Sequence, residues 1–521
     1  MNENSDKLNN YRNNLRGFLY ISEVRLIYVL IEINYLIRMP ESFKVHYLSA
    51  ECYPAAKTGG LADVVGALPK YLNKLGAEVA VFMPKYHMRW FFDKNFVVEY
   101  QGAFQLGSEY VQFQVERLDK DELGFYLYVI DIPGKFDRNG VYADSSTGIF
   151  FGDEIERNIS FQRAYLTFVN TWSELPAVIH NHDHHTGLVP FMMKFCPQFA
   201  RLKAIPSVFT IHNQAYQGAF EWDRKYLLPG YDIWNEGSLD WAGKINPLAA
   251  SVKCAWKVTT VSPSYMEELK RNSFGLEWLF NTESAKSIGI LNGIDDEVWD
   301  PKTDSYLDFK LKEDVEAFKQ ENKKILLKNS RLDINAPLLA FIGRFAMEKG
   351  ADLLYGLIEG AIKGGNPMNY LILGTGDKGV EGGLKQLADK YPHKVISFIT
   401  YNEKLSHEIY AGADFLVMPS RVEPCGLNQM YAMRYGTIPI VHNIGGLKDS
   451  VKDYDGKEGT GIKFPNLDMG VMLGKLWEAQ HIYHDKVAFW KMVQNAMDQD
   501  NSWNNSAGKY MEVYKDVLKL A

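Results

Sequence analysis

Apolar and polar positions alternate along the chain in a pattern that recurs in both halves. Short, nearly uninterrupted apolar runs are typical of buried strands, and the amphipathic stretches between them are typical of helices. In the first half, 62–75 and 155–172 are the clearest predicted helices. Five apolar runs there are predicted strands: 43–50, 78–84, 125–132, 177–182 and 206–212.

The same alternation restarts near Pro337, after a charged, Lys-rich stretch over 310–331 that we predict to be a helix plus a connection. Four predicted strands follow, at 338–343, 369–374, 394–400 and 415–419. Strand and helix alternating twice over favours two parallel sheets, and a chain of 521 residues is too long for one compact core. We therefore expect an α/β protein with two Rossmann-like, doubly wound parallel-sheet domains.

The N-terminal stretch has a different composition. Residues 1–14 are polar and rich in Asn, and 15–37 turns apolar. Four charged residues interrupt the apolar part: Arg16, Glu23, Arg25 and Glu32. It is therefore a poor membrane span, and it lacks the small-residue cleavage site of a signal peptide. We predict an appended helix, or upstream sequence translated ahead of a natural start at Met39.

Overall charge and cysteine content narrow the functional class. A net charge of −7 and a pI near 6.0 give no reason to expect nucleic acid or an anionic membrane as a partner. The cysteines lie far apart without metal-ligand spacing, which suits a reducing cytosol and argues against a disulfide framework. They are Cys52, Cys196, Cys254 and Cys425. We expect a cytoplasmic protein, and the sequence leaves its oligomeric state open.

Ligands of doubly wound sheets bind beyond the carboxyl ends of the strands, so the residues that follow each strand are the candidates for chemistry. After the first strand, Gly59 and Gly60 precede a helix, where backbone amides can approach an anion, and Lys57 adds a mobile cation. The alternative is a plain tight turn. The segment is not a P-loop, because the required Lys-Ser/Thr spacing is absent.

Two segments of the second half have similar chemistry. Arg344 and Lys349 follow a predicted strand and can grip a diphosphate, the first as a planar fork and the second as a point charge. Glu423 precedes a helix start and can accept hydrogen bonds from sugar hydroxyls, while free helix amides face the ligand. The alternatives are a solvated charge pair and an acid placed favourably at a helix dipole.

Histidines cluster at positions 180, 182, 184 and 185. Consecutive ligands with no carboxylate at matching spacing make a poor metal site, so a structural or hydroxyl-binding role is favoured and no metal is expected. His212, at the end of a later strand, is a separate candidate.

Two further motifs are weaker. The segment 374–379 fits G-x-G-x-x-G, but no ribose-binding acid follows the next strand, which argues against a dinucleotide. Asp453 and Asp455 match the acidic pair of metal-dependent glycosyltransferases, but they lie in a polar, Gly-rich turn.

Together these motifs resemble the bacterial and plant glycogen/starch synthase family, glycosyltransferases of the GT-B type, whose two Rossmann-like domains face a cleft. The segment 57–63 reads K-T-G-G-L-A-D and 210–218 reads T-I-H-N-Q-A-Y-Q-G, as in the family. Other segments follow in the family's order: 291–295, Arg344 with Lys349, 374–377 and 423–427. The resemblance runs from about residue 43 to 520.

The resemblance implies transfer of glucose from ADP-glucose to the non-reducing end of an α-1,4-glucan with retention of configuration, and no cofactor or metal. Lys57, Arg344 and Lys349 would contact the donor phosphates. Asp63 would lie beside the acceptor channel or the transferred sugar. His212 would hold the glucose near its reacting carbon, and Glu423 would bind the 3-hydroxyl region.

Further residues are implied as substrate-binding. Tyr401 would stack on the adenine and Asp183 would line the acceptor side. The remaining candidates lie in the matched motifs: Gly59, Gly60, Asn213, Gln217, Asn292, Gly376, Cys425, Gly426 and Leu427. The family usually has Trp where this chain has His184, which puts the aromatic contact with the acceptor in doubt, and 234–242 also departs from the pattern.

The expected domains are an extension over 1–42 outside the catalytic fold, an acceptor domain over 43–300 and a nucleotide-sugar domain over 301–503. The last helix, about 504–521, is expected to pack back on the first domain. Three alternatives stay open: a related transferase that uses UDP-glucose or a small acceptor, a non-catalytic glucan-binding protein, and, more remotely, an NAD-dependent oxidoreductase.

Overall fold

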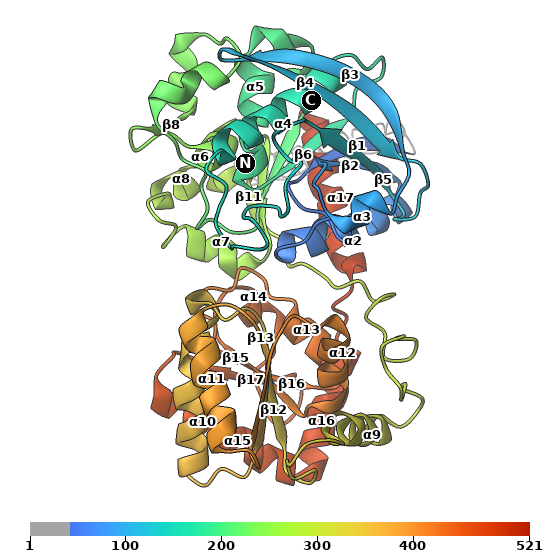
Figure 1. The fold of residues 1–521 in the computed structure, drawn as a ribbon, viewed down its shortest axis with the longest axis vertical. Helices are drawn as coiled ribbons and strands as arrows, with labels where there is room; N and C mark the ends of the chain where they lie inside the picture. Colours follow the sequence, from blue (N-terminus) through green and yellow to red (C-terminus); the bar gives the residue numbers. More distant parts are fainter. Residues whose placement is uncertain (1–41) are drawn as a thin grey trace, which may run out of the picture. The chain divides into compact units, whose positions relative to one another are not determined.

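The structure is a computed structural model that describes residues 42–521 (Figure 1). The predicted extension, with the start proposed at Met39, lies outside the described residues apart from Ser42. Residues Lys44–Ala521 form one compact unit. None of the helices in the described part of the chain combines the length and the apolar character that crossing a membrane requires.

The first sheet is a parallel sheet with an antiparallel edge. Its strands are β1 (Phe43–Leu48), β2 (Ala77–Pro84), β3 (Phe96–Leu106), β4 (Glu109–Leu118), β5 (Tyr126–Asp131), β6 (Val178–His182), β7 (Ser207–Ile211), β10 (Lys257–Thr260) and β11 (Ser287–Gly289). Their order is β11-β10-β7-β6-β1-β2-β5-β4-β3. β4 pairs antiparallel with both β5 and β3, whereas β6, β7, β10 and β11 pair in parallel.

The strands predicted in this half are confirmed as β1, β2, β5, β6 and β7. The sequence did not predict β3 and β4, because β4 alternates exposed and buried residues and so lacks a continuous apolar run. β10 and β11, with four and three residues, are too short to give such a run. The helices of this half are α2 (Gly60–Lys74), α3 (Arg89–Phe92), α4 (Glu154–Val169), α5 (Val189–Phe195), α6 (Pro247–Cys254), α7 (Pro263–Leu269) and α8 (Glu277–Thr282).

The second sheet is parallel throughout, with the order β14-β13-β12-β15-β16-β17. Its strands are β12 (Leu338–Ile342), β13 (Asn369–Gly374), β14 (Val395–Ile399), β15 (Phe415–Met418), β16 (Ile438–His442) and β17 (Ile462–Phe464). The four strands predicted here are confirmed as β12 to β15. Two sheets with interleaved helices, parallel except for the antiparallel edge of the first, confirm the predicted fold class.

Helices cover both faces of this sheet, with α10 and α11 on one side and α12, α13 and α16 on the other (Figure 1). The helices of the second half are α9 (Val315–Leu327), α10 (Leu354–Lys363), α11 (Lys378–Lys390), α12 (Glu403–Gly412), α13 (Asn428–Arg434), α14 (Gly445–Ser450), α15 (Met469–His484), α16 (Lys486–Asp498) and α17 (Trp503–Leu520).

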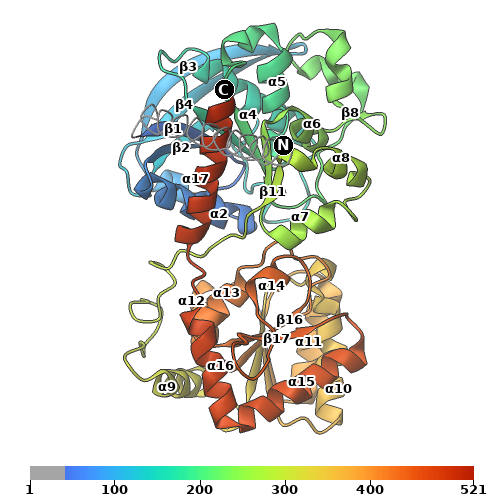
Figure 2. The ribbon, with the colours of Figure 1, turned by 180° about the vertical axis from the view of Figure 1, so that it is seen from behind.

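The final helix, α17, returns to the first half of the chain and lies beside α2 (Figure 2). Tyr514 of α17 shares a hydrogen bond of 2.5 Å between hydroxyls with Tyr47 of β1, and its hydroxyl lies 2.8 Å from Nδ1 of His180. Trp503 and Tyr510 of the same helix are fully buried. The helix therefore completes the core around the nine-stranded sheet.

Candidate active site

The loop after β1 is organised by one buried carboxylate. Glu51 accepts hydrogen bonds from the backbone N–H of Thr58, at 2.5 Å, and of Gly59, at 3.0 Å. Its other oxygen accepts from the hydroxyls of Thr58 and Tyr142, at 2.6 and 2.7 Å. Glu51 was not predicted from the sequence, and it holds the Gly59–Gly60 turn in place at the start of α2.

The two glycines of this turn have open space where a side chain would lie. A Cβ added at Gly59 or at Gly60 would meet nothing within 4 Å. The protein's own packing therefore does not require glycine at either position, and the absence of a side chain leaves room for another molecule to approach the backbone.

Lys57 and Asp63 form an ion pair of 2.6 Å beside this turn. Burial raises the pKa of Asp63, and Lys57 only partly offsets that effect. Burial also acts to lower the pKa of Lys57, but the Asp63 carboxylate outweighs it, so the net shift is upward. Tyr401 and Glu403, from the second half of the chain, lie close enough to act electrostatically on Lys57.

Neutral histidines line the ends of β6 and β7. Nε2 of His180 lies 2.6 Å from the Thr210 hydroxyl, and Nδ1 of His182 lies 3.0 Å from Nε2 of His212. Burial lowers the pKa of His212 to about 3 and holds the pKa values of His180 and His182 well below the ordinary value. These rings are uncharged at pH 7 and suited to hydrogen bonds with hydroxyls.

Asp183 joins the ends of β6 and β7. Its backbone has a positive φ of 56°, and its carboxylate accepts hydrogen bonds from the backbone N–H of His212, at 2.7 Å, and of Asn213, at 3.4 Å. Burial raises the pKa of Asp183 to about 6. The predicted site residues Asp183, His212 and Asn213 are therefore brought together, and Asp183 has a clear structural role in placing His212.

Gln217 and Asn292 lie near this group in different settings. The Gln217 side chain accepts a hydrogen bond from Asn246 at 2.7 Å and donates to the carbonyl of Phe274 at 3.3 Å, which is a structural arrangement. Asn292 follows β11, and its buried side-chain oxygen has no hydrogen-bond partner in the described structure. This oxygen can accept a hydrogen bond from a ligand.

In the second half, Lys349 and Glu423 form an ion pair of 2.7 Å. The Glu423 carboxylate is almost fully buried and also accepts from the Ser420 hydroxyl at 2.8 Å. Gly350 follows Lys349 with a φ of 67°, and a Cβ there would lie 1.9 Å from the Pro419 carbonyl oxygen. Only glycine permits this close approach, which fixes Lys349 against the end of β15.

Arg344 and Gly376 lie on the neighbouring loops after β12 and β13. Arg344 is exposed and ion-paired with Glu348, four residues further along the chain. A Cβ on Gly376 would lie 2.4 Å from the Phe345 carbonyl oxygen, and the two residues form a β-bridge. Gly376 is therefore explained by the close packing of these two loops.

Contacts between the two halves lie around the segment that follows Glu423. The Ser262 hydroxyl donates to the Pro424 carbonyl at 2.6 Å, and the backbone N–H of Gly445 donates to Glu268 at 2.7 Å. Cys425, the next residue, is buried, and Gly426 has a φ of 74°. Leu427 then precedes α13, so the segment lies between the end of β15 and the helix that follows.

Tyr401 follows β14 and is 75% exposed, so its ring is open to a planar partner. The neighbouring Glu403 accepts a hydrogen bond of 3.5 Å from the hydroxyl of Tyr53, another contact between the two halves. The structure thus brings Tyr401 near Lys57 and Asp63, although they are separated by more than three hundred residues.

Comparisons with known proteins give starch synthases, glycogen synthases or related glycosyltransferases as similar to this chain. Residues 44–282 match a family model described as the starch synthase catalytic domain, and 322–471 match one described as glycosyl transferases group 1. A glycogen synthase of Flavobacterium johnsoniae is 44% identical over 478 residues, which are 91% of this chain and 99% of that protein. A glycogen synthase of Streptococcus agalactiae is 36% identical, over 91% of this chain and all of that protein.

A solved structure agrees with the sequence comparisons. The catalytic domain of starch synthase IV from Arabidopsis thaliana, bound to ADP and acarbose, superposes with a TM-score of 0.82 at 29% identity. The match covers 92% of this chain and all of that one. From these matches over nearly the whole chain, we conclude that this protein belongs to the glycogen and starch synthase family of glycosyltransferases.

Proposed function

We propose that the protein is a glycogen synthase that transfers glucose from ADP-glucose to the non-reducing end of an α-1,4-glucan, with retention of configuration and without a metal in the reaction. The observation that carries this proposal is the placement of Lys57, Arg344 and Lys349 at the strand ends of the two sheets, with Glu423 beside Lys349. Binding glucan alone requires no such set of cations, which argues against a non-catalytic glucan-binding protein.

The three cations would stabilise the diphosphate as it departs. Preorganised charges aimed at a developing charge provide a large part of the catalysis in many enzymes. In the structure each of the three is held by a carboxylate, and the phosphates of a donor would compete with or join those partners. The cations are therefore positioned before the donor arrives.

His212 would bind the glucose next to the reacting carbon. Glycosyl transfer passes through a transition state with positive charge on the sugar ring. A neutral imidazole is compatible with that charge, whereas an imidazolium would repel it, and burial keeps His212 neutral at pH 7. Since its Nε2 is engaged with His182, a substrate hydroxyl would bond to Nδ1.

The proposal is tested with purified protein and labelled ADP-glucose or UDP-glucose, with and without glycogen, in EDTA. We expect label in glycogen, and activity that persists in EDTA. Complete loss in EDTA that a divalent ion restores would overturn the metal-independent reaction. Release of free glucose without glycogen labelling, or transfer only to a small acceptor, would contradict the proposed glucan synthase activity.

Donor choice is tested in competition at equal concentrations of the two nucleotide sugars. We expect ADP-glucose to be preferred, because the exposed Tyr401 ring offers a stacking platform on which a purine covers more area. Stacking of a base on an aromatic ring contributes about 1–3 kcal/mol, so Tyr401→Ala should lose much of the preference. Faster consumption of UDP-glucose by the wild type would reverse the donor assignment and leave the reaction class intact.

A further inference from the structure

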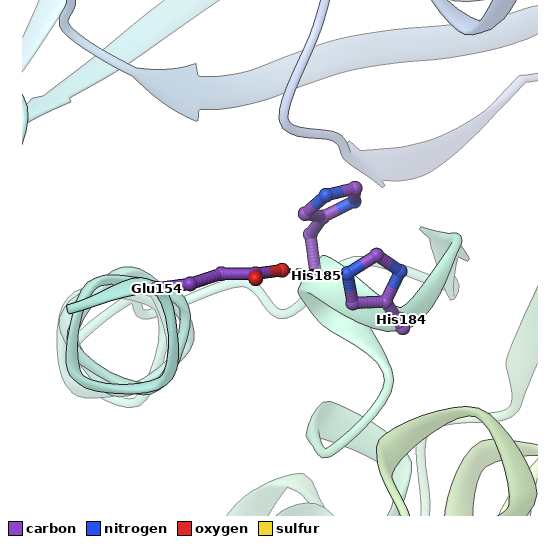
Figure 3. A group of neighbouring side chains, drawn as sticks. All are labelled: Glu154, His184 and His185. Atoms are coloured by element: carbon purple, nitrogen blue, oxygen red, sulfur yellow. Dashed lines mark hydrogen bonds and ion pairs between the residues drawn. The ribbon is translucent and has the colours of Figure 1, made fainter. Parts of the chain in front are cut away.

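Glu154, His184 and His185 converge outside the residues that we place in glucose transfer (Figure 3). Glu154 is the first residue of α4, and the two histidines begin the short helix η1 (His184–Thr186). One possible metal-ligand atom from each residue lies within 4.8 Å of the others. Nε2 of His184 is 3.0 Å from Oε1 of Glu154, and the two imidazole rings are 3.8 Å apart between centroids.

The fold, rather than local spacing, creates this group. The spacing along the sequence argues against a metal at the histidines, because no carboxylate lies at matching spacing, but α4 brings Glu154 beside His184 from thirty residues upstream. Gly218 packs directly on His184, where a Cβ would lie 2.6 Å from the ring. Tyr142 stacks on His185 with centroids 4.8 Å apart. Each imidazole therefore packs against a neighbouring residue.

Each histidine has a ring nitrogen without a protein partner. Nδ1 of His184 and Nδ1 of His185 are buried and have no hydrogen-bond partner in the described structure. Metal binding would engage the lone pair of a neutral imidazole and the charge of a carboxylate, and this group of residues offers both types of ligand.

Two of the three residues, Glu154 and His184, line a cavity of about 190 Å³, and half of the Glu154 side chain is exposed. His185 is buried behind them and does not line the cavity. That volume holds a metal ion with bound water. The nearby positive charge of Arg157 opposes a cation, but its guanidinium is engaged by the Val141 carbonyl at 2.9 Å and by the ring of Phe151.

A simple hydrogen bond between the helix and the loop is the alternative interpretation. It accounts for Nε2 of His184 but assigns no partner to Nδ1 of His184 or of His185. Two imidazoles and one carboxylate, by contrast, form a ligand set typical of zinc sites that keep a position for water.

We propose that Glu154, His184 and His185 bind a divalent transition metal of the zinc type, at a site separate from the three cations assigned to the donor phosphates. Bonds of about 2.0–2.1 Å to zinc would require the most distant ligand pair to approach by roughly 1 Å, through ring rotation. The bound metal would link the start of α4 to η1, next to Asp183.

The test is titration of the metal-free full chain with Zn²⁺ against a chromophoric chelator, with variants Glu154→Gln and His184→Trp. The second restores the residue that the family usually has. We expect one Zn²⁺ per chain in the wild type and at least about tenfold weaker binding in each variant, as losses at metal sites typically show. His393→Ala, which removes an exposed histidine elsewhere, is the matched control and should bind like the wild type.

A second readout identifies the ligands. Co²⁺ in the wild type should give the strong visible absorption of a site with few ligands, and Glu154→Gln should alter that spectrum. Circular dichroism shows whether the His184→Trp protein is folded. If it is unfolded, the test rests on Glu154→Gln, which changes a half-exposed side chain. Equal Zn²⁺ affinity in the wild type and Glu154→Gln, or no stoichiometric binding by the wild type, would overturn the proposal.

Discussion

The strand ends of the two sheets differ in the kind of polar group they present. At β6 and β7 the groups are buried, neutral histidines hydrogen-bonded to one another and to Thr210. After β12 and β15 they are ion pairs, Lys349 with Glu423 and Arg344 with Glu348. Neutral rings suit sugar hydroxyls and a sugar that becomes positive, whereas fixed charges suit a diphosphate. Under the proposed function, this division would correspond to the sugar and the diphosphate of the donor, with Glu423 as the one sugar contact on the second sheet.

Lys57 is the exception, because it places a cation on the histidine side of this division. Its partner Asp63 makes the pair resemble those of the second sheet. All three cations assigned to the donor phosphates therefore have a carboxylate partner in the absence of substrate. Partly buried lysines need such partners, since an unpaired buried charge is strongly destabilising.

The largest expected effect concerns a charge pair that lies away from the site. Lys323 donates to Asp414 at 2.7 Å, and both side chains are buried beneath the second sheet. Lys323→Met leaves the Asp414 carboxylate without its cation and should lower the free energy of unfolding by about 3–5 kcal/mol. Urea denaturation measures this loss. Lys324→Met, next to it and exposed, should change stability by less than about 0.5 kcal/mol.

An equal loss of unfolding free energy in both variants would contradict the expected cost of leaving the buried Asp414 carboxylate without its cation. The kcat of Lys323→Met, measured where the protein is folded, should stay close to that of the wild type, because Lys323 has no assigned role in the site.

A smaller effect is expected from Arg344→Ala, which removes a cation assigned to the diphosphate. Loss of a contact that strengthens in the transition state costs roughly 3 kcal/mol, or about a hundredfold in kcat. Arg344 is exposed, so the variant should keep the stability of the wild type. A lower kcat would then reflect the lost contact and not unfolding. The control is Lys363→Ala, which also removes an exposed cation that is paired with a carboxylate four residues away, Glu359. Wild-type turnover by Arg344→Ala would refute the assigned role.

The sequence locates the candidate cations at the ends of strands but does not show which carboxylates pair with them. Arg344 and Lys349 were predicted because they follow an apolar strand, and Glu348 lies within reach along the same segment. The pairing of Lys349 with Glu423 spans 74 residues and depends on the meeting of two strand ends. Glu51 was missed for a similar reason, since its role appears only when the loop after β1 folds back on it. Local pattern predicts elements, and tertiary packing decides which side chains meet.

The smallest effect concerns the neutral histidines and appears as a dependence of stability on pH. The folded pKa of His212 is about 3, below the ordinary 6.5, so unfolded chains bind a proton that folded chains exclude. Stability should therefore fall as pH drops from about 6.5 towards 3. Between pH 7 and pH 5 this one residue accounts for about 2 kcal/mol.

His212→Gln should flatten that part of the pH profile, measured by urea denaturation at pH 7 and at pH 5. His393→Gln, at an exposed position, should leave it as in the wild type. Asp183 acts in the opposite direction, since its raised pKa of about 6 makes stability fall as pH rises from about 4 to 6. An unchanged profile in His212→Gln would show that this ring is not the neutral group described.

The return of α17 to the first sheet has a consequence for how the protein is made. A ribosome completes β1 and α2 early, yet the helix that covers them, with Tyr514 bonded to Tyr47, is synthesised after the entire second sheet. During that interval, the apolar surface that Trp503 and Tyr510 later cover is exposed in the growing chain. It must not bind other apolar segments. A nascent chain that ends before residue 503 would lack α17. The resulting packing defect would lie around β1 and α2, which are translated first, and not at the truncated end.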